Sequence, residues 1–165
     1  MRLALLFLLL SGWLQARSPS RMAVSPAERL KTDEQIALWQ GRVQREPRNP
    51  QYRLALAKSY IQKVRESADF SYLDRASQLV ERIVGEGNAA YEAMRLRSEI
   101  ELERHNFIAV AEYSEELTRI EPRDPWNWGT LGDARMELGQ YDGARDAYAR
   151  MVTLRPDLYS FNRMA

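Results

Sequence analysis

Residues 128–156, which read WGTLGDARMELGQYDGARDAYARMVTLRP, say more about the fold than any other stretch of this chain. Large and small residues alternate there at spacings that suit two short antiparallel helices joined by a tight turn. The bulky residues that would fill the space between the helices are Trp128, Leu131, Tyr141 and Tyr148. Gly132 and Ala144 stand where the two backbones must approach closely. Gly139 suits the turn because glycine tolerates a positive φ, and Pro156 ends the second helix.

This stretch resembles a tetratricopeptide repeat, a helix–turn–helix unit of about 34 residues. Its main departure from the family pattern is Arg135, where an aromatic residue is usual. Such units stack into solenoids that bind other proteins, so the resemblance implies an all-α fold and points to recognition rather than catalysis. A single helix pair cannot bury its apolar face alone, and we therefore expect further repeats in the chain.

The neighbouring repeats are located by register. Residues 46–50 (EPRNP) and 121–125 (EPRDP) are nearly identical and lie 75 residues apart, which is seven more than two periods of about 34. The surplus falls near residues 62–69, so the first repeat has either a longer loop between its helices or an overlong first helix. Residues 91–124 keep the period but form a degenerate repeat. There Arg97, Ser98 and His105 take the places of Leu131, Gly132 and Gly139.

The sequence thus predicts an all-α solenoid of antiparallel helix pairs over residues 25–165. Its three repeats are expected at about 50–90, 91–124 and 125–158, preceded by a covering helix within 25–47 and followed by the start of a further repeat at 159–165. That last stretch would leave Tyr159, Phe161 and Met164 exposed, so either the chain is a fragment of a longer array or this end docks on a partner.

The first residues are a separate matter. Arg2 is followed by a short apolar run and a small residue, Ala16, which is typical of a cleaved secretory signal peptide at residues 1–16. Residues 17–24 are interpreted as a linker. The prediction is an exported protein of the bacterial type, periplasmic or extracellular; an uncleaved anchor or a buried N-terminal helix is the alternative. The chain contains no cysteine, so it has neither a disulfide nor a lipid-modified cysteine.

Charge and catalytic motifs narrow the function. Removal of residues 1–16 takes away one basic residue, Arg2, and leaves 23 Lys and Arg against 23 Asp and Glu. This balance favours neither nucleic acid nor a membrane surface as the main partner. Glu101 and the only histidine, His105, lie four residues apart, but such a lone pair is usually a solvated helix end. We therefore expect no enzyme activity, no cofactor and no metal.

The remaining possibility is a binding surface. In the family, the first helix of each repeat lines a concave groove, and its residues outside the core face the ligand. The resemblance implies the following groove residues: Lys58, Arg95, Glu99, Leu102, Trp126, Thr130, Asp133, Met136 and Glu137. The expected partner is a peptide or helix with basic and apolar residues, anchored on Trp126 and Met136 and paired with Asp133 and Glu99. The predicted function is a protein-interaction scaffold or adaptor. The alternative is the non-catalytic arm of a larger enzyme or regulator that continues beyond residue 165.

Overall fold

A computed structural model of the chain describes residues 31–87 and 90–164. These residues form helices and no strand, which confirms the predicted all-α class. The helices are α1 (Thr32–Arg45), α2 (Pro50–Ser67), α3 (Ser71–Gly85), α4 (Ala90–Glu103), α5 (Phe107–Ile120), α6 (Pro125–Glu137), α7 (Tyr141–Leu154) and α8 (Leu158–Met164). The predicted export signal at 1–16 and linker at 17–24 lie outside the described residues.

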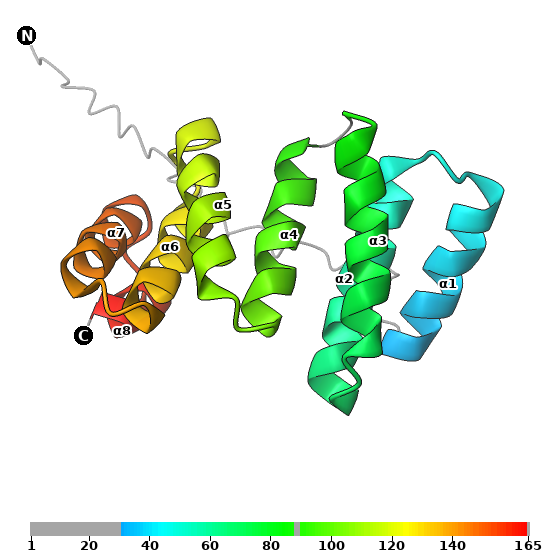
Figure 1. Cartoon of the computed structure of the whole chain (residues 1–165), viewed down its shortest axis with the longest axis horizontal. Coiled ribbons are helices and arrows are strands. Elements are labelled where there is room, and N and C mark those ends of the chain that lie inside the picture. The colour runs from blue at the N-terminus through cyan, green and yellow to red at the C-terminus, as the bar shows by residue number, and fades with distance from the viewer. Residues whose placement is uncertain (1–30, 88–89, 165) are drawn as a thin grey trace, which may run out of the picture.

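The helices stand side by side in a row that runs from α1 at one end of the molecule to α7 and α8 at the other (Figure 1). Consecutive helices pack on each other, and α2 also contacts α4. The helices pair as α2–α3, α4–α5 and α6–α7, while α1 packs on α2 with Ile36, Trp39 and Val43. The architecture is the expected α-solenoid of helix pairs.

Five of the seven surplus residues of the first repeat lengthen its first helix. Helix α2 has 18 residues, whereas the corresponding helix α6 has 13. The helix begins at Pro50, after Asn49 caps it by accepting a hydrogen bond from the amide of Gln51 at 3.1 Å. It ends where Ala68 adopts a left-handed conformation with φ 56°. The overlong helix, and not the longer loop, is therefore the outcome.

The third repeat is built around the contact between Gly132 and Tyr148. A Cβ atom placed on Gly132 would lie only 2.3 Å from the Tyr148 ring, so only glycine leaves room for that ring. Gly132 therefore makes room for the Tyr148 side chain, and not for the close approach of the opposing backbone that the sequence suggested. Gly139 has the expected positive φ, 72°. Arg135 replaces the usual aromatic residue by donating to the carbonyl of Gly143 and pairing with Glu115 on α5.

The degenerate second repeat has the same two features, a close contact between its helices and a left-handed residue in the turn, but forms them with other residues. Ser98 and Ser114 occupy the places of Gly132 and Tyr148, and their hydroxyl oxygens lie 3.3 Å apart inside the core. His105, in the place of Gly139, adopts φ 57°, the same left-handed conformation. Both helices of this repeat therefore keep the family geometry without its glycines.

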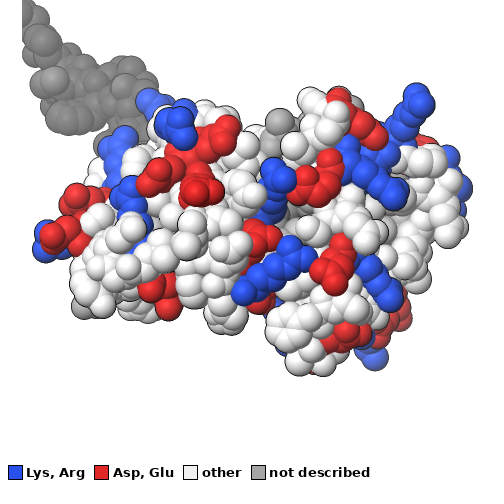
Figure 2. All heavy atoms as spheres, in the orientation of Figure 1, with Lys and Arg blue, Asp and Glu red and all other residues white. Residues whose placement is uncertain are grey.

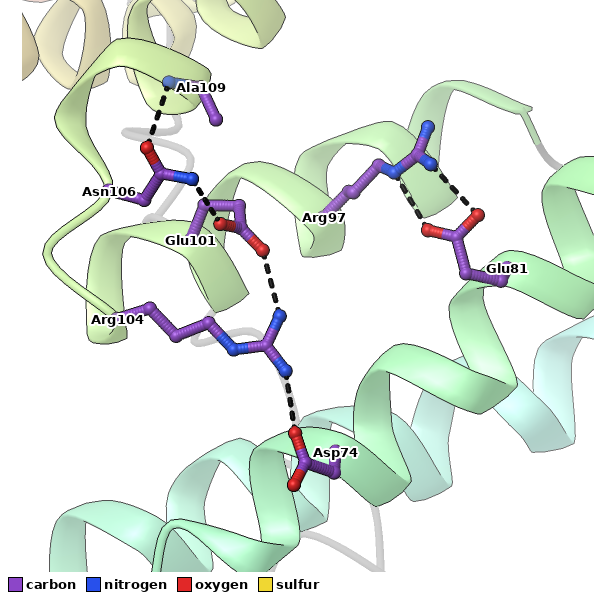
Figure 3. Close-up of polar contacts among 7 residues, drawn as sticks. All are labelled: Asp74, Glu81, Arg97, Glu101, Arg104, Asn106 and Ala109. Atoms are coloured by element: carbon purple, nitrogen blue, oxygen red, sulfur yellow. Dashed lines mark hydrogen bonds and ion pairs between the residues drawn. The ribbon is translucent and has the colours of Figure 1, made fainter.

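Arg97 of α4 and Arg104, the residue after it, hold α4 against α3 (Figure 3). Arg97 forms two 2.8 Å contacts with the Glu81 carboxylate, and Arg104 bridges Asp74 and Glu101 at 2.8 and 2.9 Å. Glu101 in turn accepts from Asn106, whose side-chain oxygen caps α5. Glu101 is therefore engaged by Arg104 and Asn106 and is not a free solvated carboxylate.

The buried apolar residues form a continuous cluster from α1 to α4 and a smaller one between α6 and α7. The larger cluster includes Ile61, Leu73, Val80, Ile83 and Ile100, which are almost fully buried. Along residues 31–87 and 90–164, none of the helices combines the length and the apolar character needed to cross a bilayer.

Candidate protein-binding groove

The first helices of the repeats, α2, α4 and α6, together with α8, line one face of the solenoid. At the α1 end of this face, a pocket of about 490 Å³ opens between α1, α2 and α4. Leu54, Ala55 and Trp39 give it an apolar floor and wall, and polar side chains surround them. The full lining is Gln35, Trp39, Gln51, Leu54, Ala55, Lys58, Ser59, Gln62, Arg65, Glu92 and Glu99.

Helix α2 supplies most of this lining because of its spacing. Gln51, Leu54, Ala55, Lys58 and Gln62 recur at intervals of three and four residues, which places them in one stripe along the helix. The opposite stripe of α2 is buried against α1 and α3. One helix thus serves the core with one side and the pocket with the other.

Aromatic rings form the wall of the pocket on the α1 side. The ring centroids of Trp39 and Tyr52 lie 6.0 Å apart, and the Arg42 guanidinium lies 5.0 Å from the Trp39 ring and 5.4 Å from the Tyr52 ring. The cation stacks on the faces of both rings and fixes the indole in place. Trp39 keeps one side toward the pocket.

An ion-pair cluster forms the opposite wall. Arg65 donates to Glu103 at 2.6 Å and to Glu99 at 2.8 Å. Burial lowers the pKa of Arg65, but the hydrogen bond with Glu103 and the two carboxylate charges outweigh burial, so its pKa is raised. The overlong α2 makes this contact possible, because Arg65 belongs to its last turn. Lys58 and Glu92 form no ion pair with other described residues.

The middle of the groove contains a stacked pair. The Arg95 guanidinium lies 4.4 Å from the Trp126 ring centroid and 3.3 Å from a carboxylate oxygen of Asp124. Asp124 also caps α6 by accepting from the amide of Trp126 at 2.9 Å. The cap, the cation and the ring therefore hold one another, and Trp126 is left half-buried at the surface.

At the far end, Asp133 is already engaged within the chain. Its two oxygens accept from Arg163 of α8 at 2.8 and 2.7 Å, and one of them also accepts from the Tyr148 hydroxyl at 3.0 Å. Burial raises the pKa of Tyr148, and the charge of Asp133 and its hydrogen bond raise it further. The phenol therefore stays protonated and keeps donating to Asp133.

The predicted groove residues fall into separate groups. Lys58 and Glu99 line the pocket, while Arg95 and Trp126 form the stacked pair. Thr130 is only 4% exposed, which removes it from the accessible surface. Glu99 and Asp133 already pair with Arg65 and Arg163, so their charges are compensated. Of the others, Leu102 is half-buried, and Met136 and Glu137 are exposed near the end of α6.

Several pocket residues were not predicted from the sequence. Gln35 and Trp39 belong to α1, which the sequence suggested only as a cover for the first repeat. Ala55, Ser59 and Arg65 lie on α2 outside the positions carried over from the family. The sequence feature that pointed toward these residues was the surplus of seven residues. It showed that the first repeat departs from the common geometry, but it did not show which face of the repeat is affected.

The charges of the molecule are mixed. Lys and Arg alternate with Asp and Glu across the face shown in Figure 2, and neither sign forms a stripe there. Among residues 31–87 and 90–164, no three His, Asp or Glu side chains come together in a way that could hold a metal ion.

Comparison with solved structures places the fold. A crystal structure of MamA matches 85% of this chain and 81% of its own at 15% identity, with a TM-score of 0.65. MamA of AMB-1, in a P212121 crystal, matches 81% of this chain and 69% of its own at 17% identity, with a TM-score of 0.62. MamA of MSR-1 matches 81% and 73% at 18% identity, also at 0.62. This likeness shows a tetratricopeptide-like fold.

No family model matches the chain, and no curated protein matches it either.

Proposed function

We propose that this protein is a non-catalytic scaffold that binds a helix or peptide of a protein partner in its concave groove. The observation that carries the proposal is the pocket between α1, α2 and α4, which combines an apolar floor with a polar rim. Ala55 and Trp39 offer an anchor site for an apolar side chain, and the exposed Gln51 on the rim can form hydrogen bonds with a backbone.

The charges of the groove favour an apolar anchor over a salt bridge. A basic residue of the partner would have to compete with Arg65 for Glu99 and with Arg163 for Asp133. Lys58 and Glu92 have no such competitor within the described chain, so they are the charges that can pair with a partner. The proposed contact surface therefore consists of the pocket, Lys58 and Glu92, continued by the half-buried Trp126 and the exposed Met136.

Site-specific photo-crosslinking in the native cell tests this proposal. A photoreactive amino acid at Lys58 should give a discrete crosslinked species of higher mass, since this residue borders the pocket. The matched control is Glu112, an exposed residue of α5 outside the pocket. If the probe at Lys58 yields no product beyond that at Glu112, the groove does not bind a partner and the proposal is wrong.

Export belongs to the same proposal. It rests on the charged start and short apolar run of residues 1–16, which fit a signal peptide. The test is the N-terminal sequence of the protein purified from its native cell. A new terminus close to residue 17 in an extracytoplasmic fraction is expected, and an intact Met1 terminus in the cytoplasmic fraction would contradict export.

A further inference from the structure

Helix α8 presents an apolar face that no described residue covers. Phe161 is 52% exposed and Met164 43%, although both are large apolar side chains. The repeat register explains what this face is for. Helix α6 begins at Pro125 after Asp124, and α8 begins at Leu158 after Asp157, which sets a shift of 33 residues. With this shift Phe161 of α8 corresponds to Trp128 of α6, and Met164 corresponds to Leu131.

Hydrogen bonds agree with this alignment. Asn127 donates to the carbonyl of Glu121, the residue after α5, and Ser160 donates to the carbonyl of Arg155, the residue after α7. Both donor residues are buried and stand 33 positions apart. The two acceptors are 34 positions apart because the loop before α8 is one residue shorter than the loop before α6. In α6, Trp128 packs on Ala144, Tyr148 and Met151 of α7. The equivalent face of α8 is therefore shaped to receive the second helix of a repeat.

Helix α8 corresponds to the first helix of a repeat, whereas α1 corresponds to the second helix of a repeat. The first helix of that repeat is not among the described residues. The residue after α1, Glu46, has nearly the same backbone angles as Arg155, the residue after α7, which sets a shift of 109 residues. With this shift Trp39 corresponds to Tyr148, and Leu38 corresponds to Ala147. Tyr148 and Ala147 are buried, whereas Trp39 and Leu38 are only half-buried. The α1 side of the pocket, beside Trp39, thus corresponds to the position that α6 holds beside α7, while Glu92 and Glu99 of α4 line the other side.

We infer that α8 of one copy binds beside α1 and α2 of a second copy, at the Trp39 side of the pocket, with Phe161 and Met164 packed on Leu38 and Trp39. The composite order α8–α1–α2 would repeat the α6–α7–α8 interface of the single chain. The two surfaces lie at opposite ends of the row of helices, so the contact forms between copies (Figure 1). Because it joins different surfaces, the association is head-to-tail and open-ended.

The polar residues of α8 agree with this placement. Asn162 stands in the place of Gly129, where an added Cβ would lie 3.7 Å from Arg163 on the next first helix. In the second copy the place of Arg163 is taken by Ala55, a pocket residue flanked by Gln51, Ser59 and Gln62. The Asn162 amide therefore meets amide and hydroxyl groups. Arg163 stays paired with Asp133 of its own chain and brings no unpaired charge into the contact.

This inference rests on the proposed function, since it gives the groove a specific occupant. The first test is sedimentation velocity of the full chain from about 5 µM to about 500 µM, a range that covers weak interfaces. The average mass should rise past that of a dimer. Phe161→Asp should weaken association about 30-fold, as loss of an anchor residue does. Ile108→Asp is the matched control, because Ile108 is an exposed apolar residue on α5, and it should leave association unchanged.

A mixing experiment tests the polarity of the contact. Phe161→Asp blocks α8, and Ala55→Trp fills the pocket, so each variant alone should be monomeric while an equimolar mixture stops at a dimer. Circular dichroism checks that both variants fold. Disulfide trapping gives a second measurement, since the chain has no cysteine of its own. Leu38→Cys mixed with Phe161→Cys should crosslink faster than Ile108→Cys mixed with Phe161→Cys.

A wild-type chain that stays monomeric at the highest concentration, or a Leu38 pair that crosslinks no faster than the Ile108 pair, overturns the inference. These failures differ from failure of the proposed function. The photoreactive probe at Lys58 would then still capture a protein, and that protein would not be a second copy. Absence of any product at Lys58 removes both proposals together.

Discussion

Replacement of Gly132 by alanine tests the packing at the centre of the third repeat. A Cβ on this residue would lie 2.3 Å from one Tyr148 ring atom and 2.5 Å from another, while ordinary contacts begin at 3.4 Å. The ring must therefore retreat by about 1 Å, and a buried ring is less able to move than the end of a flexible chain.

The magnitude follows from two opposing effects. Alanine within a helix is favoured over glycine by about 1 kcal/mol. Overpacking of a close-packed core costs about 1–3 kcal/mol, and the shift also stretches the 3.0 Å hydrogen bond from Tyr148 to Asp133, worth about 1 kcal/mol more. The net expectation for Gly132→Ala is destabilisation by about 1–3 kcal/mol.

Urea denaturation followed by circular dichroism measures this change. Gly41→Ala is the matched control, because Gly41 also lies inside a helix and a Cβ added there would meet its nearest atom 3.7 Å away, at the end of Arg45. That variant should be more stable than the wild type by up to about 1 kcal/mol. The packing explanation is wrong if Gly132→Ala is as stable as the wild type, or if both variants shift in the same direction.

Three further predictions concern single groups. Ser98→Ala leaves the buried Ser114 hydroxyl without its partner and should cost about 1–2 kcal/mol, while Ser98→Ala with Ser114→Ala should cost less than the two single changes together in a double-mutant cycle. The backbone hydrogen bond from Ser160 holds the pKa of Asp157 below 3.8, so the stability that this carboxylate gives α8 is present above pH 3.8 and lost as pH falls through the lower folded pKa. An NMR titration of the Ser160 amide should therefore have its midpoint below 3.8, and a midpoint above it would contradict the cap. Burial and Asp133 raise the pKa of Tyr148 above 10.0, so its contribution is complete below pH 10.0 and is lost as pH rises beyond it; the wild type should lose stability more steeply there than Tyr148→Phe.

The sequence was sufficient for the fold because helix ends are decided locally. Proline after a helix, an acceptor side chain before it and a left-handed residue in the turn act within a few positions of one another. The turn at Gly139 and the helix end before Pro156 could therefore be assigned from the sequence alone. The same reasoning predicted the degenerate second repeat, although the Ser98–Ser114 pair that replaces Gly132 and Tyr148 was not foreseen.

The site was less predictable because its ion pairs join residues far apart in the chain. Arg65 and Glu99 are 34 positions apart, and Arg163 and Asp133 are 30 apart. A long arginine side chain can reach several carboxylates, and only the stacking of the helices selects one of them. The pocket beside Trp39 depends on which helix stands next to α1, and no property of α1 alone determines that.

The ion pairs also define which residues of the groove can distinguish one partner from another. Arg65 joins α2 to α4, Arg95 joins α4 to the start of α6, and Arg163 joins α8 to α6. Partly exposed pairs of this kind contribute only about 0–1 kcal/mol each to stability. Their main effect is to neutralise the carboxylates of the groove before a partner arrives.

A partner therefore gains little from acidic or basic residues placed opposite these pairs, because it must first displace a charge that is already bound. Apolar contact with Trp39 and Ala55 has no such competitor, since these half-buried side chains line the open pocket. Burial of apolar surface yields about 25 cal/mol per Å², and ionic screening does not weaken it as it weakens exposed charge pairs. Binding in this groove should consequently follow the apolar residues of the incoming helix, which is the character of Phe161 and Met164 on α8.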